Sequence, residues 1–170
     1  IIRRRDDNRL GGFAKGSYQG VCEHHFVELN LGDVDTLLGV DIIAQGWIRP
    51  TDTSINVASS QGSSPPPKAL EVSVPDGKGD WKVVIPNAGF PAGKLKTIIL
   101  ELPTGSFVGG DNRVRIATNL EIYWDKIGFA TQTNKNFTEI PIEMLSADLG
   151  YMGFPAMSRT SNDAPNIPNY

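Results

Sequence analysis

Apolar and polar residues alternate over much of this chain, and the longest such stretch runs from Arg113 to Ala130. One parity of this stretch carries its large apolar residues, which are Val114, Ile116, Leu120, Ile122 and Trp124. A period of two is typical of extended chain with one buried face. Past Asp125 the apolar residues, Ile127 and Phe129, take the other parity. Because a one-residue slip sends side chains to the opposite face, we expect a β-bulge or a change of sheet near Asp125-Lys126.

Similar alternation predicts further strands. A hairpin is expected where Leu70–Val74 and Trp81–Ile85 flank a glycine-containing turn over Pro75–Asp80. The chain from Gly39 to Arg49 has apolar residues on both parities, which is typical of an inner strand covered on both faces. The remaining predicted strands are Val21–Leu31, Ser54–Ala58, Leu95–Leu102 and Glu139–Leu145.

Eight or more short strands, without a convincing amphipathic helix, predict an all-β fold. We expect a two-sheet antiparallel β-sandwich, jelly-roll or galactose-binding-domain-like, with extended termini. The 18 glycines and 12 prolines suit a chain rich in turns, and 170 residues suit one domain with a real core. The expected division is an N-terminal arm over 1–20, the sandwich over 21–154 and an extended tail over 155–170.

Composition limits the classes of function. The net charge of −3 does not favour nucleic acid or a membrane surface as the main partner. Cys22 is the only cysteine, so no internal disulfide can form, which suits the cytosol or a bacterial periplasm. No apolar run reaches the roughly 18 residues that span a bilayer. The chain begins with Ile1, so we expect that an N-terminal segment was removed or never included.

Four segments resemble a β-rich module of large bacterial secreted or periplasmic proteins: Tyr18–Gly20, Glu28–Gly32, Gly46–Ala58 and Arg115–Asp125. In those proteins the module accompanies FG-GAP propeller repeats, tetratricopeptide repeats and ASPIC/UnbV-type segments, which this chain lacks. The resemblance covers about Gly16 to Phe154 and implies neither catalytic residues nor a defined ligand. In strand pattern, the chain is also similar to the galactose-binding, discoidin-like jelly rolls.

Residue types that could carry chemistry are few. Cys22, His24 and His25 lie together, but neighbouring histidines of a strand point to opposite faces, so we expect neither a metal site nor a Cys–His nucleophile. The segment Asp76–Asp80 is similar to a calcium loop, yet Lys78 stands where an oxygen ligand is needed. Carboxylates fall in turns and on outward strand positions. We therefore expect no enzyme and no cofactor.

The aromatic residues divide into two sets. Trp81 and Trp124 share parity with aliphatic neighbours and are expected in the core. Trp47 and Tyr123 take the other parity, and the charged residues near them in sequence are Arg49, Asp52, Arg115 and Asp125. Aromatic faces beside planar polar groups are typical of sugar binding, and the same types anchor protein interfaces. In a third interpretation the terminal arms cover both rings.

The favoured function is a non-catalytic interaction module, an accessory or structural subunit docked on a larger extracytoplasmic bacterial assembly. A periplasmic or extracellular location follows from the resemblance. The alternative is a carbohydrate-binding, lectin-like module. We interpret Arg3, Arg4 and Arg5 either as a solvated arm or as an arm that docks on an acidic partner or on lipid headgroups.

Overall fold

The computed structural model describes residues 3–6, 8–132, 138, 140–151, 153–159 and 166–169. Its elements are β1 (Val21–Asn30), β2 (Val40–Ile48), α1 (Thr53–Gln61), β3 (Leu70–Pro75), β4 (Trp81–Ala88), β5 (Lys96–Leu102), β6 (Arg113–Leu120), β7 (Ile122–Thr131), β8 (Ala156–Ser158) and β9 (Ile167–Asn169). Every strand pairing among the described residues is antiparallel. The predicted all-β class with antiparallel sheets is therefore confirmed.

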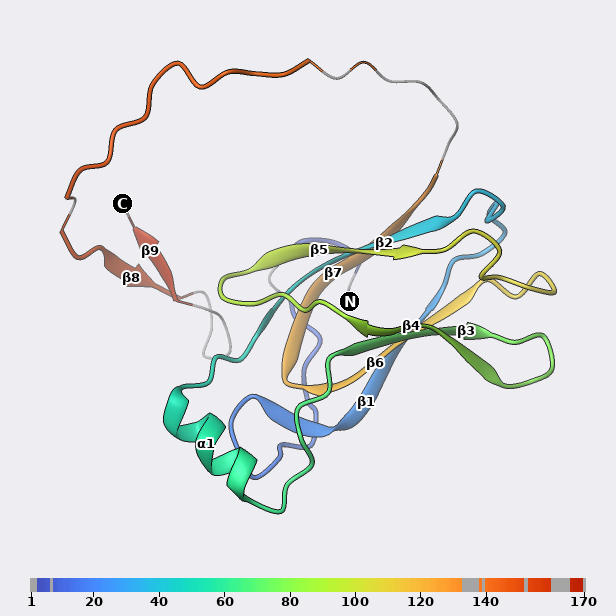
Figure 1. Cartoon of the computed structure of the whole chain (residues 1–170), viewed down its shortest axis with the longest axis horizontal. Coiled ribbons are helices and arrows are strands. Elements are labelled where there is room, and N and C mark those ends of the chain that lie inside the picture. Colours follow the sequence, from blue (N-terminus) through green and yellow to red (C-terminus); the bar gives the residue numbers. More distant parts are fainter. Residues whose placement is uncertain are drawn as a thin grey trace.

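Seven of the strands form two sheets that lie one above the other (Figure 1). The larger sheet has the strand order β1-β6-β3-β4, and the smaller has the order β5-β2-β7. Strands β8 and β9 pair with each other and lie to one side of the two sheets (Figure 1). We refer to the larger and smaller sheets together as the two-sheet body.

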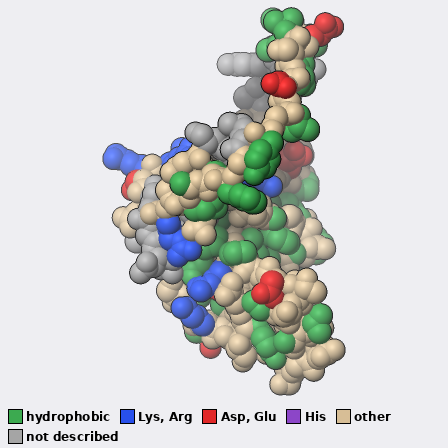
Figure 2. Space-filling model, turned by 90° about the vertical axis from the view of Figure 1, so that its left-hand side faces the viewer, with side chains coloured by type: hydrophobic (Ala, Val, Ile, Leu, Met, Phe, Trp, Pro, Cys, Tyr) green, Lys and Arg blue, Asp and Glu red, His purple; other side chains and the backbone are tan. Residues whose placement is uncertain are grey.

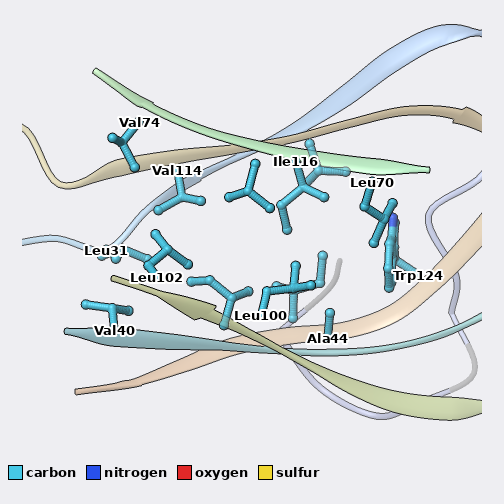
Figure 3. Packing of buried hydrophobic residues seen from close by; sticks show 14 of the residues in the cluster. Leu31, Val40, Ala44, Leu70, Val74, Leu100, Leu102, Val114, Ile116 and Trp124 are labelled. Atoms are coloured by element: carbon cyan, nitrogen blue, oxygen red, sulfur yellow. The ribbon is translucent and has the colours of Figure 1, made fainter. Parts of the chain in front are cut away.

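The hydrophobic core lies between these two sheets. In Figure 3, Val114 and Ile116 of β6 lie on one side of the core, and Val40 and Ala44 of β2 lie on the opposite side. Trp124 of β7 is only 1% exposed and closes one end of this core (Figure 3). Removal of apolar surface from water is the main force that holds two such sheets together. The parity predicted to be buried along β6 and β7 is buried in the structure.

The stretch from Arg113 to Ala130 is divided at one residue. Glu121 separates β6, in the larger sheet, from β7, in the smaller sheet. Its neighbours Leu120 and Ile122 are both buried in the same core. The chain thus changes sheet here without changing the parity of its buried side chains, four residues before the expected position.

The predicted β-bulge lies at Asp125. Gln45 of β2 pairs with Lys126, whereas the next residue, Gly46, pairs with Trp124. Asp125 is therefore an extra residue in β7, and the bulge returns Ile127 to the core, where it is 7% exposed. The prediction of a bulge from the change of parity is confirmed.

The predicted strand over Ser54–Ala58 is wrong, because this segment belongs to helix α1. Asp52 is its N-cap: the Asp52 carboxylate accepts a hydrogen bond of 2.8 Å from the Ile55 backbone N–H. A second bond of 3.0 Å runs from the Asn56 N–H to the Asp52 carbonyl. An aspartate that satisfies the free N–H groups of a first turn favours a helix over the short alternation of apolar residues that follows.

The predicted strand over Glu139–Leu145 is also wrong where the structure describes it. Residues 140–145 form no strand, and Glu139 lies outside the described residues. No edge strand lies beside this segment, which arcs away from the two-sheet body (Figure 1). Alternation of apolar residues makes a strand only when a neighbour accepts its backbone hydrogen bonds.

The hairpin of β3 and β4 is confirmed, but Trp81 is not in the core. The register of the two strands shifts between Val72 and Ser73, so that Val72 pairs with Ile85 and Ser73 pairs with Val83. This shift places Val83 on the outer face, where it is 45% exposed. Trp81 is half-buried on the same outer face rather than among the core residues.

Strand β2 is central in its sheet, as predicted, but it is not covered on both faces. Val40, Ile42 and Ala44 face the core and are fully buried. Ile43, on the other face, is 38% exposed. Strand β2 therefore carries more apolar residues than its one buried face requires.

The N-terminal arm follows the two-sheet body over part of its length. The Leu10 N–H donates a bond of 2.8 Å to the Trp124 carbonyl, and the Glu23 N–H donates one of 3.0 Å to the Ala14 carbonyl. In the tail predicted to be simply extended, β8 and β9 form a short antiparallel pair. No helix within the described residues is long and apolar enough to cross a membrane.

Candidate functional site

Glu121, the residue at which the chain changes sheet, is the centre of a buried polar cluster. Glu121 is buried, with only 4% of its surface exposed. The carboxylate accepts hydrogen bonds from the Tyr123 hydroxyl at 2.6 Å, the Gly20 N–H at 3.2 Å and the Arg49 guanidinium at 3.3 Å. Its backbone also bonds to Gly20 and Arg49. One carboxylate thus joins the end of β2, the start of β7 and the start of β1.

The charge of this carboxylate is balanced by Arg49. The ion pair joins the Arg49 guanidinium, with a side chain 35% exposed, to the buried Glu121. Burial lowers the pKa of Arg49, but the negative charge of Glu121 and hydrogen bonds to Tyr123 and Glu121 outweigh it, so the pKa is raised. Arg49 is therefore a neutralising partner and not a free cation that could hold an acidic ligand.

The two aromatic candidates, Trp47 and Tyr123, lie against each other, and the N-terminal arm contacts Tyr123. Their rings are stacked: the two ring centres lie 5.1 Å apart and the ring planes form an angle of 16°. Phe13 of the arm meets the Tyr123 ring edge-on at 5.7 Å, and a Cβ atom on Gly11 would lie 3.2 Å from that ring. Trp47 and Tyr123 are 6% and 7% exposed. The arm thus covers Tyr123, as the third interpretation expects for both rings, and both residues are buried.

The other predicted site residues do not share one surface. Asp52 caps α1. Asp125 is fully buried in the bulge, where one carboxylate oxygen lies 3.4 Å from the Asp6 N–H. Arg115 lies on the outer face of the larger sheet, next to Trp81. The structure therefore brings together Trp47, Arg49 and Tyr123, whereas Asp52, Arg115 and Asp125 have other contacts.

The outer face of the larger sheet carries a second aromatic group that the sequence pattern did not predict. The Arg115 guanidinium lies 4.0 Å from the centre of the Phe26 ring and 3.9 Å from that of Trp81. Arg115 also donates a hydrogen bond of 2.9 Å to the Glu28 carboxylate. Phe26 is 49% exposed, so this stack of two rings and a guanidinium reaches the solvent.

Charges on this outer face are paired. Arg113 contacts Asp111 at 2.7 Å and Glu28 at 3.3 Å. Hydrogen bonds from Arg115 lower the pKa of Glu28, and hydrogen bonds from Arg113 lower that of Asp111. The same contacts, chiefly those with Asp111, raise the pKa of Arg113. The face is therefore polar and aromatic around Phe26 and Trp81, where the charges of Arg113, Arg115, Glu28 and Asp111 balance.

Cys22 and His25 come closer than their spacing suggested. The Cys22 sulfur lies 3.5 Å from the His25 Nδ1 atom, near an irregularity in β1. The thiol donates to the Asn119 carbonyl at 3.4 Å, and its pKa is raised to about 11, first by burial and then by the charges of Glu121 and Glu23. A thiol held protonated at neutral pH is a poor nucleophile. No group of three metal-ligating side chains occurs among the residues the structure describes.

Two of the residues that organise these sites had weak signals in sequence. Glu121 stands between two apolar residues, so its parity predicted an outward position. Phe26 shares parity with polar neighbours in β1, and this pattern agrees with its exposure. The pattern gives no sign that Arg115 packs on the Phe26 ring. Comparison with protein-family models, curated proteins and solved structures finds no match to this chain.

Proposed function

We propose that this chain is a non-catalytic interaction module that docks on another protein of a larger assembly through the segment 140–154. The observation that carries this proposal is the exposure of large apolar side chains along the segment. They are Ile140 (79%), Ile142 (95%), Met144 (78%), Leu145 (100%), Leu149 (101%), Tyr151 (87%) and Phe154 (97%). Figure 2 shows hydrophobic side chains along the projecting part at the top of the molecule.

Such exposure is costly in water. Full burial of one large aliphatic or aromatic side chain stabilises a complex by roughly 1.5–3 kcal/mol before entropy is subtracted. Folded monomers rarely leave apolar side chains of this size together on the surface, and contiguous apolar patches commonly mark protein interfaces. Period-two alternation over Ile140, Ile142 and Met144 also suits an added strand on the sheet edge of a partner.

Two further statements belong to this proposal. We interpret the two-sheet body as a jelly-roll-type β-sandwich, because the chain passes repeatedly between two antiparallel sheets that share one core, with only the β3–β4 hairpin staying within one sheet. The extracytoplasmic bacterial location rests on the resemblance described above. Arg3, Arg4 and Arg5 are exposed and supply a second, cationic contact.

The test is co-purification of the tagged chain with its assembly from its native cells. A variant with Ile142→Asp and Leu145→Asp should lose at least nine-tenths of the co-purified partner, because two charges replace buried anchors. The control variant, Glu143→Gln with Asp148→Asn, changes polar positions of the same segment and should retain the partner. Equal co-purification by both variants would refute the proposal.

A second candidate function, glycan binding, is favoured by one observation. Phe26 and Trp81 flank a guanidinium on the outer face of the larger sheet, beside the paired carboxylate of Glu28. Rings with planar polar groups suit the C–H face and hydroxyls of a neutral sugar. Glycan-array binding that is lost in Trp81→Ala but kept in Val83→Ala would favour this function. The buried Trp47 and Tyr123 are not available for it.

A further inference from the structure

A cavity of 530 Å³ lies between helix α1 and the two-sheet body. Its volume falls in the range of sites that hold small organic molecules, about 300–1,000 Å³. The residues around it come from four regions: the start of β1 with the neighbouring Leu120, the end of β2, one side of α1, and the loops that contain Pro66, Pro67 and Phe90. Figure 2 views the molecule from the side on which α1 lies in Figure 1.

The walls of this cavity away from α1 are fixed by hydrogen bonds. The Asn119 side chain accepts a bond of 2.6 Å from the Lys68 N–H and donates one of 2.9 Å to the Pro66 carbonyl. The Gln19 amide donates a bond of 2.6 Å to the Pro50 carbonyl. Both proline-containing walls are thus held in place by specific contacts, so the cavity exists before any ligand arrives.

Helix α1 does not fill the space beneath it. None of its residues is buried, and Ile55 and Ser59, one turn apart, are its half-buried residues. A helix that packs on a core usually places large apolar side chains at both such positions, but here the second is a serine. A nine-residue helix is marginal without tertiary packing, so a molecule between α1 and the body would supply contacts that the chain lacks.

The lining also defines the chemistry of that molecule. Among the described residues that line the cavity, Arg49 alone is charged, and Glu121 neutralises it. Apolar contacts come from Val21, Ile48, Leu120 and Phe90 and from the prolines. Neutral hydrogen-bonding groups come from serines and amides at the α1 side. A charged ligand would find no opposite charge to pair with, whereas an uncharged apolar one would lose little on entry.

We propose that this cavity is a binding site for a small, uncharged and predominantly apolar molecule, with α1 as its outer wall. The site is separate from the segment 140–154 and does not depend on the proposed docking function. Bound there, the molecule stabilises α1 by packing against Ile55 and Ser59.

The experiment uses the neutral fluorescent probe N-phenyl-1-naphthylamine and the full chain. The wild type should bind the probe saturably. Ser59→Leu places a larger side chain in the cavity and should weaken binding at least tenfold while raising the melting temperature. The matched control, Ser54→Leu, adds the same group to α1 at an exposed position that does not line the cavity, and should bind like the wild type.

Two additional measurements control for misfolding of a variant and for probe binding at another place. Saturating probe should slow hydrogen exchange of the α1 amides in the wild type, a result that does not depend on any variant folding. The Ile142→Asp, Leu145→Asp variant should bind the probe normally, because the exposed apolar segment is not the site. The inference is overturned if binding is not saturable, if Ser59→Leu and Ser54→Leu bind equally, or if binding is lost with the variant in segment 140–154.

Discussion

Gly46 shows how a single residue permits the bulge that orients β7. A Cβ atom at this position would lie 2.7 Å from the Tyr123 carbonyl oxygen and 2.8 Å from the Trp124 ring. Trp124 is 1% exposed and cannot move without disturbing the core. The close approach of two backbones at the bulge therefore requires a residue without a side chain.

We predict that Gly46→Ala lowers the free energy of unfolding by about 1–3 kcal/mol, the usual cost of forcing extra atoms into a packed core. Urea denaturation followed by tryptophan fluorescence measures this change. Gly128→Ala in β7 is the matched control, since a Cβ there meets nothing within 4 Å. Equal stability of the two variants would show that the approach at Gly46 is not restrictive.

The second prediction at this scale concerns the Cys22 thiol. Its pKa is raised from 9.0 to about 11 by burial and by nearby carboxylates. At pH 8 the native protein should therefore hold about 100-fold less thiolate than the unfolded chain. Reaction with Ellman's reagent should be slower by at least that factor in the native protein than in urea.

The same shift makes stability depend on pH. Because the folded state keeps its proton above the pH at which the unfolded thiol loses it, the contribution of Cys22 to stability is constant well below pH 9 and is lost as the pH rises toward 11. The contribution lost is on the order of 3 kcal/mol. Cys22→Ser should remove this part of the alkaline decline. Rapid modification of native Cys22 at pH 8 would contradict the assignment.

At the scale of elements, α1 depends on its cap more than on packing. Asp52 supplies the N-cap bond, and no residue of α1 is buried. Asp52→Ala should destabilise the helix by about 1 kcal/mol, which increases hydrogen exchange of its amides while the melting temperature of the two-sheet body changes little. Ser54→Ala is the control. A large fall in the melting temperature would show that α1 is integral to the core.

The strands could be predicted from sequence where alternation coincided with burial between two sheets. Val114, Ile116 and Trp124 follow that rule, and the change of parity correctly indicated the bulge at Asp125. Trp81 broke the rule because a register shift in the hairpin moved its side chain to the outer face. Pattern in one strand carries no information about the register of its partner.

Candidate sites were harder to predict because they depend on pairs of distant residues. Trp47 and Tyr123 stack on each other, but the Phe13 ring that contacts Tyr123 comes from the N-terminal arm, far away in the sequence. The outward parity of Glu121 gave no sign that it would be 4% exposed. The cavity beneath α1 escaped prediction because Ser54–Ala58 was assigned to a strand.

At the scale of the whole molecule, the two-sheet body has a closed hydrophobic core, whereas the segment 140–154 exposes its apolar side chains. The two-sheet body buries its apolar residues between its sheets (Figure 3). The segment 140–154 leaves its own in water, with Leu145 and Phe154 at 100% and 97% exposure. Under the docking proposal, these exposed apolar side chains are buried against a partner protein.

Hydrogen exchange of residues 140–151 in the free chain and in the isolated assembly tests this account most directly. The free chain should exchange these amides within seconds, because they lack the strand pairing that protects the body. In the assembly, exchange should slow by at least 100-fold over Ile140–Leu145, with β6 unchanged as the internal reference. Equal exchange of this segment in the free and assembled chain would contradict docking through it.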